Sequence, residues 1–258
     1  MVHVISADTC PEAWVKAVTH LRKQKEQYNL IVEIADSEKM TSSDFVICKN
    51  VDEFLREHDK LPLITVAGTI FPGGYYKRYG PEGVYEHFPA AYPKMKKGWG
   101  CYAMRLLRRP GKEDGETINP LEILVDKMKK QLKGLKMRGV YELGLIDTVS
   151  DLPIYDPALD SRRGRTNPCM SHLSFKLTSD KRLLLTVLYR YHYYVEKGLG
   201  NLIGLAQLHA FVAHQVGVKM GPMVCHSTLA IADFDGGWKA NDLDTLIKKC
   251  AAPEKKAA

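Results

Sequence analysis

The sequence lacks long apolar stretches and internal repeats. None of its 258 residues falls in a run that approaches the roughly 20 consecutive apolar residues needed for a membrane helix. The first residues, MVHVISADTC, also lack the basic and apolar regions of a secretory signal. These absences argue against a membrane protein and predict a cytoplasmic location.

Cysteine pairs are absent as well. The six cysteines stand at positions 10, 48, 101, 169, 225 and 250, with no C-x-x-C pair and no His/Cys cluster at zinc spacing. We therefore expect neither a metal site nor a disulfide framework. In a reducing compartment most of these thiols are expected to be small buried apolar groups, so a functional cysteine needs further context.

The charge pattern favours a small anionic ligand over a polynucleotide. The net charge is +7, and many of the lysines fall in KMKKGWG, DKMKKQLKGLKMR and the tail PEKKAA, which is typical of solvated helix faces. Arginines instead stand beside turn residues in RLLRRPGK and DSRRGRTNPC. Guanidinium groups at turns suit bidentate phosphate binding.

Hydrophobic periodicity predicts mixed α/β structure in the first half. Residues 11–28 and 50–58 have helical patterns, and residues 29–35 and 44–48 resemble short strands. Residues 61–100 are rich in Gly, Pro and aromatics, which predicts a structured loop region that shapes a binding site or packs over a sheet edge.

In the second half, residues 119–133 predict an amphipathic helix, followed by a strand at 139–147 and a polar link over 150–168. Residues 171–177 and 182–195 predict two strands, and residues 201–216 predict a helix buried in the core. A strand at 221–232 follows. We expect one domain over residues 1–235, then a short helix and a loose basic tail over 236–258.

Four features of the second half resemble the thymidylate synthases in order and spacing. They are Pro168-Cys169, a strand pair that ends in Leu188-Tyr189-Arg190, Gly200-Asn201, and the buried helix that ends in AHQVG. The resemblance is to a divergent member of the thymidylate synthase and pyrimidine nucleotide hydroxymethylase superfamily, over roughly residues 100–235. It implies a two-layer α/β (α+β) fold with a mixed sheet, a buried central helix and dimerisation through the sheet.

The resemblance also implies roles for individual residues. Cys169 matches the nucleophile, Arg190 the phosphate-binding arginine and Asn201 the asparagine that reads the pyrimidine ring. Tyr102, in Gly-Cys-Tyr-Ala, resembles the tyrosine-containing turn of the family. The other implied substrate contacts are Arg138, Arg162 and Arg163, which the family's dimer would lend across its interface, and His172.

The expected chemistry explains these residue types. A thiolate that adds to C6 of a pyrimidine turns the ring into an enolate, whose C5 attacks a one-carbon donor. Cationic groups such as Arg190 and the arginines of DSRRGR are expected to favour the thiolate of Cys169. An asparagine amide supplies a donor to the ring carbonyl and an acceptor to the ring N–H.

Departures from the family pattern indicate a changed ligand. Met170 stands where a histidine follows the nucleophile, and His172 is a nearby substitute. Directly after Arg190 the chain has Tyr191, His192 and Tyr193, where the family has a serine and an aspartate. Ile231 and Asp233 stand where the family has the late histidine and tyrosine that bind the sugar. The tail PEKKAA also replaces the apolar residues that close over folate, which argues against methylenetetrahydrofolate, the cofactor that the resemblance implies.

The sequence therefore leaves several functions open. The leading prediction is a homodimeric transferase that moves a methyl or hydroxymethyl group to C5 of a pyrimidine nucleotide monophosphate, with an interface on the sheet containing Tyr189, Tyr191 and Tyr193. The alternatives are a folate-independent hydrolase of the N-glycosidic bond and a non-catalytic nucleotide-binding protein. The structural alternatives are a buried thiol for Cys169, a carboxylate partner for Arg190 and a helix N-cap for Asn201.

Overall fold

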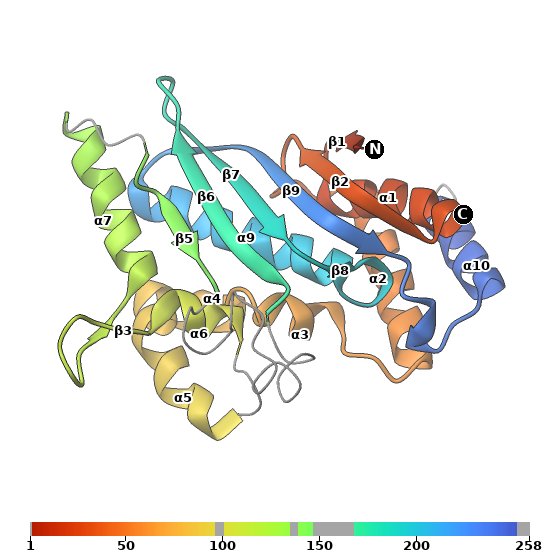
Figure 1. Cartoon of the computed structure of the whole chain (residues 1–258), viewed down its shortest axis with the longest axis horizontal. Coiled ribbons are helices and arrows are strands. Elements are labelled where there is room, and N and C mark those ends of the chain that lie inside the picture. Colours follow the sequence, from red (N-terminus) through yellow and green to blue (C-terminus); the bar gives the residue numbers. More distant parts are fainter. Residues whose placement is uncertain (1, 96–100, 135–138, 147–167, 252–258) are drawn as a thin grey trace, which may run out of the picture.

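The computed structural model describes residues 2–95, 101–134, 139–146 and 168–251 (Figure 1). Over these residues, seven strands form one mixed sheet, and β3 (Arg109–Pro110) pairs with β4 (Thr117–Ile118) in a separate ribbon. The strands of the sheet are β1 (His3–Ala7), β2 (Glu26–Ile34), β5 (Glu142–Gly144), β6 (Met170–Leu177), β7 (Arg182–Tyr189), β8 (His192–Tyr193) and β9 (Lys219–Ile231).

The sheet has the order β1-β2-β9-β7-β6-β5, with β8 paired to β9. The strand β9 is parallel to β7 and antiparallel to β2, while β6 is antiparallel to both β5 and β7. The chain leaves β7 through β8 and a helix, and then returns along β9. The β6–β7 hairpin places the start of β6 beside the end of β7, and the crossover places β9 on the other side of β7.

Helices cover one face of the sheet, and α9 runs along its middle behind the strands (Figure 1). The helices are α1 (Cys10–Gln24), α2 (Ser42–Glu57), α3 (Leu63–Gly68), α4 (Gly73–Glu82), α5 (Phe88–Met95), α6 (Tyr102–Leu107), α7 (Pro120–Leu132), α9 (Leu199–Val216) and α10 (Ala240–Ala251). Short helical turns occur at η1 (Gly83–His87), η2 (Tyr194–Gly198) and η3 (Phe234–Gly236).

The helix α9 is buried on most of its sides, as a central helix between two layers must be. Its glycines let α3 approach closely: a Cβ atom at Gly204 would lie 2.7 Å from the Ala67 carbonyl oxygen, and one at Gly200 would lie 2.6 Å from the Val66 Cβ. Larger residues at these two positions would push the helices apart. The sequence therefore uses glycine here for packing.

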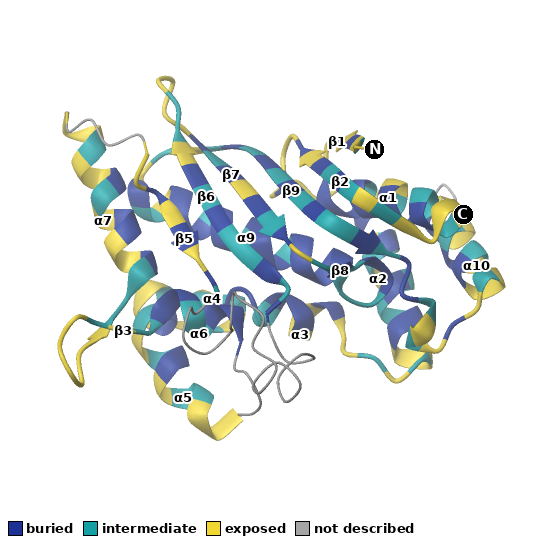
Figure 2. Ribbon diagram, viewed as in Figure 1, coloured by how far each residue is buried: buried dark blue, intermediate teal, exposed yellow. Residues whose placement is uncertain are grey.

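Along β7 the side chains alternate between two environments. Leu183, Leu185 and Val187 face the helices and are fully buried, while Leu184 and Leu188 on the opposite face are only half-buried. The neighbouring strands follow the same alternation (Figure 2). The face of the sheet opposite the helices is named the open face below.

Several predictions are confirmed. The helix at 119–133 is α7, the buried helix is α9, the hairpin is β6–β7 and the last strand is β9. The predicted mixed α/β fold with a mixed sheet is also confirmed. No helix within the described residues has the length and the apolar composition to cross a membrane.

Other predictions are wrong. Residues 44–48 belong to α2 rather than to a strand, because Thr41 and Asp44 form a capping box: Asp44 N–H donates to Thr41 Oγ1 at 3.2 Å, and Thr41 N–H donates to the Asp44 carboxylate at 2.7 Å. Within residues 61–95 the chain forms α3, α4, η1 and α5 instead of a loop region. The Gly-Pro pair marks a kink at Gly80, where φ is 63°, between two helical stretches.

The predicted strand at 182–195 is also divided. The strand β7 ends at Tyr189, the chain bends at Arg190 and Tyr191, and β8 then pairs with β9. Tyr189 is 1% exposed on the helix side. It therefore cannot serve in an interface on the open face.

The C-terminal helix α10 packs against α1 and α2. Its Leu243, Leu246 and Cys250 are buried, and Arg22 of α1 forms an ion pair with Asp244 at 2.7 Å. The helix was expected from the sequence. The boundary at residue 235 stays a prediction, and the tail over 252–258 lies outside the described residues.

Candidate functional site

Cys169 and Arg190 lie side by side where β6 begins and β7 ends. The backbone N–H of Arg190 donates to the carbonyl oxygen of Cys169 at 2.9 Å, so one hydrogen bond joins the two residues. Cys169 is half-buried and Arg190 is exposed. The structure thus brings together the residues that the sequence predicts as nucleophile and phosphate ligand.

Tyr102 holds the backbone of Cys169 in place. Its buried hydroxyl accepts hydrogen bonds from the backbone N–H groups of Cys169 and Met170, both at 3.1 Å. Tyr102 begins α6, and the N–H of the next residue, Ala103, donates to Thr69 O at 2.9 Å. The tyrosine therefore links α6 to the turn that presents the cysteine.

We expect Tyr102→Phe to lower the free energy of unfolding by about 1–3 kcal/mol, because two backbone N–H groups lose their acceptor. Chemical denaturation measures the change. The matched control is Tyr85→Phe, since the Tyr85 hydroxyl is buried without a hydrogen-bond partner among the described residues. Equal effects of the two substitutions would show that the Tyr102 hydrogen bonds contribute nothing specific.

Two opposing effects act on the Cys169 thiol. Burial raises its pKa, and the positive charge of Arg190 lowers it, but burial is the larger effect. The pKa is therefore above the ordinary thiol value, although Arg190 favours the thiolate as expected. The arginines of DSRRGR lie outside the described residues.

The side chain of Arg190 is exposed. Within the described parts of the chain it forms no ion pair with a carboxylate. Its backbone is held on both sides, because its carbonyl oxygen accepts a hydrogen bond from Thr228 Oγ1 at 2.8 Å. The choice between a ligand anion and a carboxylate partner for Arg190 stays open.

Asn201 is not a helix N-cap. Because α9 begins at Leu199, Asn201 lies inside the first turn, where its side chain contacts His192: Asn201 Nδ2 lies 3.0 Å from His192 Nε2. The other ring nitrogen of His192, Nδ1, lies 3.0 Å from Ser227 Oγ. Asn201, His192 and Ser227 thus form a buried hydrogen-bonded chain.

The ring of Tyr189 packs against this chain. It stacks on His192 with 4.0 Å between ring centroids and 7° between planes. In the strand register Tyr189 stands opposite Met170, the residue that follows Cys169. Burial raises the pKa of Tyr189 well above the ordinary tyrosine value.

His172 points to the open face. Its Nε2 lies 2.7 Å from a carboxylate oxygen of Glu142, which also contacts Ser174 and Lys176. In the strand register it stands opposite Leu188, which also faces away from the helices. A role for His172 as a substitute for the histidine after the nucleophile stays a prediction.

The remaining arginines of the predicted site, Arg138, Arg162 and Arg163, lie outside the described residues. Their role in phosphate binding across a dimer interface also stays a prediction.

Two histidines of α9 are not among the predicted site residues. His209 is buried, its Nε2 lies 2.8 Å from Leu183 O, and burial lowers its pKa to about 4. His214 is exposed, and its Nδ1 lies 3.0 Å from the Tyr76 hydroxyl.

Sequence reasoning missed the role of Asp233. Its buried carboxylate accepts hydrogen bonds from the backbone N–H groups of Val195 and Glu196, both at 2.9 Å. Burial raises its pKa to about 7, although these two hydrogen bonds oppose the shift. Asp233 thus ties the end of β9 to η2, at a position where the resemblance leads one to expect a sugar-binding residue. No local sequence signal predicts contacts across 38 residues.

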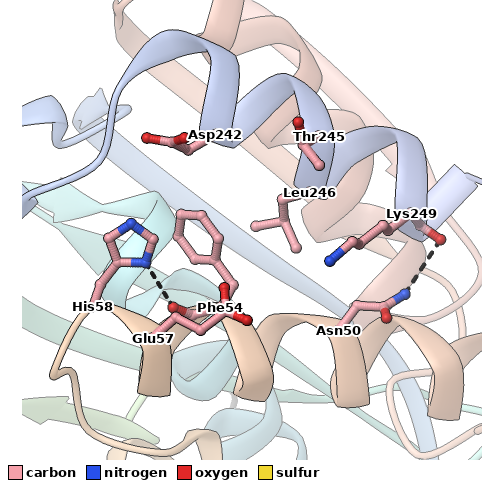
Figure 3. A pocket seen from close by; sticks show the side chains of 8 residues that line it. All are labelled: Asn50, Phe54, Glu57, His58, Asp242, Thr245, Leu246 and Lys249. Carbon is pink, nitrogen blue, oxygen red and sulfur yellow. Dashed lines mark hydrogen bonds between the residues drawn. The ribbon is translucent and has the colours of Figure 1, made fainter.

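A separate cleft lies between α2 and α10 (Figure 3). Phe54 and Leu246 form its apolar floor, and Asn50 Nδ2 donates to Lys249 O at 3.2 Å across one end. No residue of the predicted site lines it. Among the described residues, no group of His, Cys, Asp and Glu side chains is arranged to hold a metal ion.

These features define an α/β protein in which a half-buried cysteine, a tyrosine and an exposed arginine meet at the ends of two central strands. No protein-family model matches the chain. A protein of Methanothermobacter marburgensis named "Putative thymidylate synthase" is 25% identical over 231 residues, which cover 89% of this chain and 92% of that protein. This similarity suggests a distant thymidylate synthase-like relationship, and it extends beyond the region of the sequence motifs.

Proposed function

We propose that this protein is a thymidylate synthase-like transferase that modifies C5 of a pyrimidine nucleotide monophosphate through Cys169. The observation that carries the proposal is the direct pairing of Cys169 with Arg190 beside Tyr102. The similarity to a protein named as a thymidylate synthase supports the same assignment. The exposed position of Arg190 beside the half-buried Cys169 supports binding of one small anionic ligand by both residues.

The proposed chemistry begins with the thiolate of Cys169. A bond forms between its sulfur and C6 of the pyrimidine, and the electron pair of the C5–C6 double bond moves into an enolate. C5 then bonds to a one-carbon electrophile and loses its proton to a base, after which the C5–C6 double bond re-forms and the sulfur leaves as thiolate. A formaldehyde-level electrophile gives a hydroxymethyl group, whereas a methyl product needs a methyl-level electrophile or a hydride from the donor. Arg190 binds the phosphate, and Asn201 binds the ring.

The one-carbon donor is a separate question. Methylenetetrahydrofolate is the donor that the resemblance implies, but the described residues do not form an apolar C-terminal segment able to close over it. The last described helix, α10, is instead held against α1 and α2 by buried Leu243 and Leu246. We therefore assign no step to folate and propose only that a one-carbon electrophile is used.

The reaction class is tested by incubating the protein with UMP, dUMP, CMP and dCMP, with and without methylenetetrahydrofolate, and analysing the products by mass spectrometry. A nucleotide that gains a methyl or hydroxymethyl group at C5 supports the proposal. Release of the free base would instead identify the N-glycosidic hydrolase. Binding without any product under these conditions would favour the non-catalytic alternative.

We also propose that the open face mediates a homodimer. Half-buried apolar side chains lie on this face: Ile31, Leu184, Leu188, Pro222 and Val224. They stand beside the polar cluster of Glu142, His172 and Lys176. A second copy of the same face would remove this apolar surface from water.

We expect light scattering at micromolar concentration to give twice the 29.1 kDa chain mass, and Leu188→Lys to raise the dimer dissociation constant by about tenfold or more, because a charge would be buried in the interface. The control is Ile64→Lys on α3, since Ile64 is 67% exposed and distant from this face in the fold. A monomeric wild-type protein would contradict the proposed interface.

A further inference from the structure

The chain formed by Ser227, His192 and Asn201 becomes more exposed toward Asn201. Ser227 is fully buried, His192 is 1% exposed and Asn201 is 6% exposed. Asn201 is therefore the most exposed member of the chain. His192 and Ser227 are sealed in the core, where they can act only through Asn201.

The directions of the hydrogen bonds follow from the Asn201 amide. Its NH₂ group can only donate, so His192 Nε2, which lies 3.0 Å from Asn201 Nδ2, is the acceptor. His192 Nδ1 then carries the ring proton and donates to Ser227 Oγ at 3.0 Å.

Packing keeps the imidazole in this arrangement. Its ring stacks on Tyr189, and the ring of Tyr194 lies 4.6 Å from it between centroids. Burial lowers the pKa of His192 to about 3, so the ring is neutral at physiological pH and Nε2 retains its lone pair. The imidazole of His192 is therefore held in place by its neighbours and stays neutral.

We propose that His192 is a positioning residue that fixes the orientation of the Asn201 amide. With Nδ2 held toward His192, the carbonyl oxygen Oδ1 becomes the acceptor offered to the ligand. A ring that presents an N–H beside a carbonyl, as uracil does, fits this arrangement. This inference rests on the proposed function, because it concerns the same pyrimidine site.

Cytosine has a lone pair on the ring nitrogen in place of the N–H. To donate to that nitrogen, the side-chain amide of Asn201 would have to rotate by about 180° so that its NH₂ group faces the ligand. The carbonyl oxygen of Asn201 would then face the lone pair of His192 Nε2, and both buried atoms would lose their hydrogen bond. Leaving such groups unpaired corresponds to about a tenfold to hundredfold loss in affinity. We therefore expect the wild-type protein to bind dUMP about tenfold to hundredfold more tightly than dCMP.

The test compares the dUMP and dCMP affinities of wild type, His192→Phe and His192→Gln by isothermal titration calorimetry. The Phe variant keeps an aromatic ring that can stack on Tyr189 but removes the acceptor, so its preference should fall to about twofold or less. The Gln variant can accept from or donate to the Asn201 amide, so it should keep more of the binding affinity than His192→Phe while losing the preference for dUMP. A purely structural role for His192 would reduce both affinities equally and leave their ratio unchanged, which would overturn the inference.

Failure of the inference and failure of the proposed function are distinguishable. If wild type binds both nucleotides equally, or His192→Phe keeps the preference, the positioning role is overturned and nucleotide binding stands. If wild type binds neither, the proposed function fails. Should the variants not fold, ¹⁵N NMR of histidine-labelled wild type decides: a proton on Nδ1 of His192 supports the inference, and one on Nε2 overturns it.

Discussion

Cys169→Ser is expected to abolish turnover of the pyrimidine nucleotide, by about a thousandfold or more, while leaving the affinity for the nucleotide nearly unchanged. Serine matches cysteine closely in size, so the packing against the core is kept. Its hydroxyl, however, is a far weaker nucleophile than a thiolate at neutral pH. Steady-state kinetics and calorimetry on the same preparation separate the two effects.

The pH dependence of the wild-type turnover rate tests the same role of Cys169. Burial raises the pKa of Cys169 above the ordinary thiol value, so the reactive thiolate fraction and the wild-type rate should still increase as pH rises through the ordinary thiol range. The matched control is Cys48→Ser, because Cys48 is also a half-buried free cysteine but lies on α2. Turnover of Cys169→Ser near the wild-type rate would exclude covalent addition by this residue.

Arg190→Ala is expected to weaken binding of a pyrimidine nucleotide monophosphate by about tenfold to hundredfold, because one charge-assisted hydrogen bond to phosphate is worth roughly 1.5–3 kcal/mol. Binding of the matching nucleoside should change little. Loss of the arginine also removes the charge that lowers the pKa of Cys169, so alkylation of the thiol at neutral pH should become slower. Calorimetry and an iodoacetamide assay measure the two results.

A suitable control for this prediction lies on the same strand. Arg182 begins β7, is exposed and forms an ion pair with Asp180 at 2.7 Å, so Arg182→Ala removes an equal charge at the opposite end of the strand. It should leave nucleotide affinity unchanged. Equal losses of nucleotide and nucleoside affinity in Arg190→Ala would move Arg190 out of the phosphate site.

The elements that sequence patterns predict well are those whose environment is uniform along their length. The helix α9 is apolar on nearly every side, and the hairpin β6–β7 alternates around a polar turn except at the irregularity between Met170 and His172. The secondary structure of residues 61–95 is harder to predict, because Gly and Pro there stand at helix ends and at the kink of Gly80 rather than in loops. In residues 44–48 a capping box outweighed a short strand-like pattern.

In the candidate site, too, some contacts can be predicted from the sequence and others cannot. The order of Cys169 and Arg190 along two predicted strands was enough to bring them together, because a hairpin pairs its ends. The partnership of His192 with Ser227 depends on the position of β8 beside β9, which residue spacing does not reveal. Tyr189 was expected at an interface because the bend at Arg190, which ends the strand, was not foreseen.

The most direct test of the proposed chemistry is hydrogen exchange at C5 of the nucleotide in D₂O. Addition of Cys169 to C6 creates an enolate that takes a deuteron from solvent at C5, and elimination then returns the free thiol and a labelled nucleotide. We expect NMR to show deuterium at C5 with the wild-type protein and none with Cys169→Ser. Nucleotide that binds without exchange at any pH, with or without methylenetetrahydrofolate, or exchange that persists in Cys169→Ser, would contradict the account.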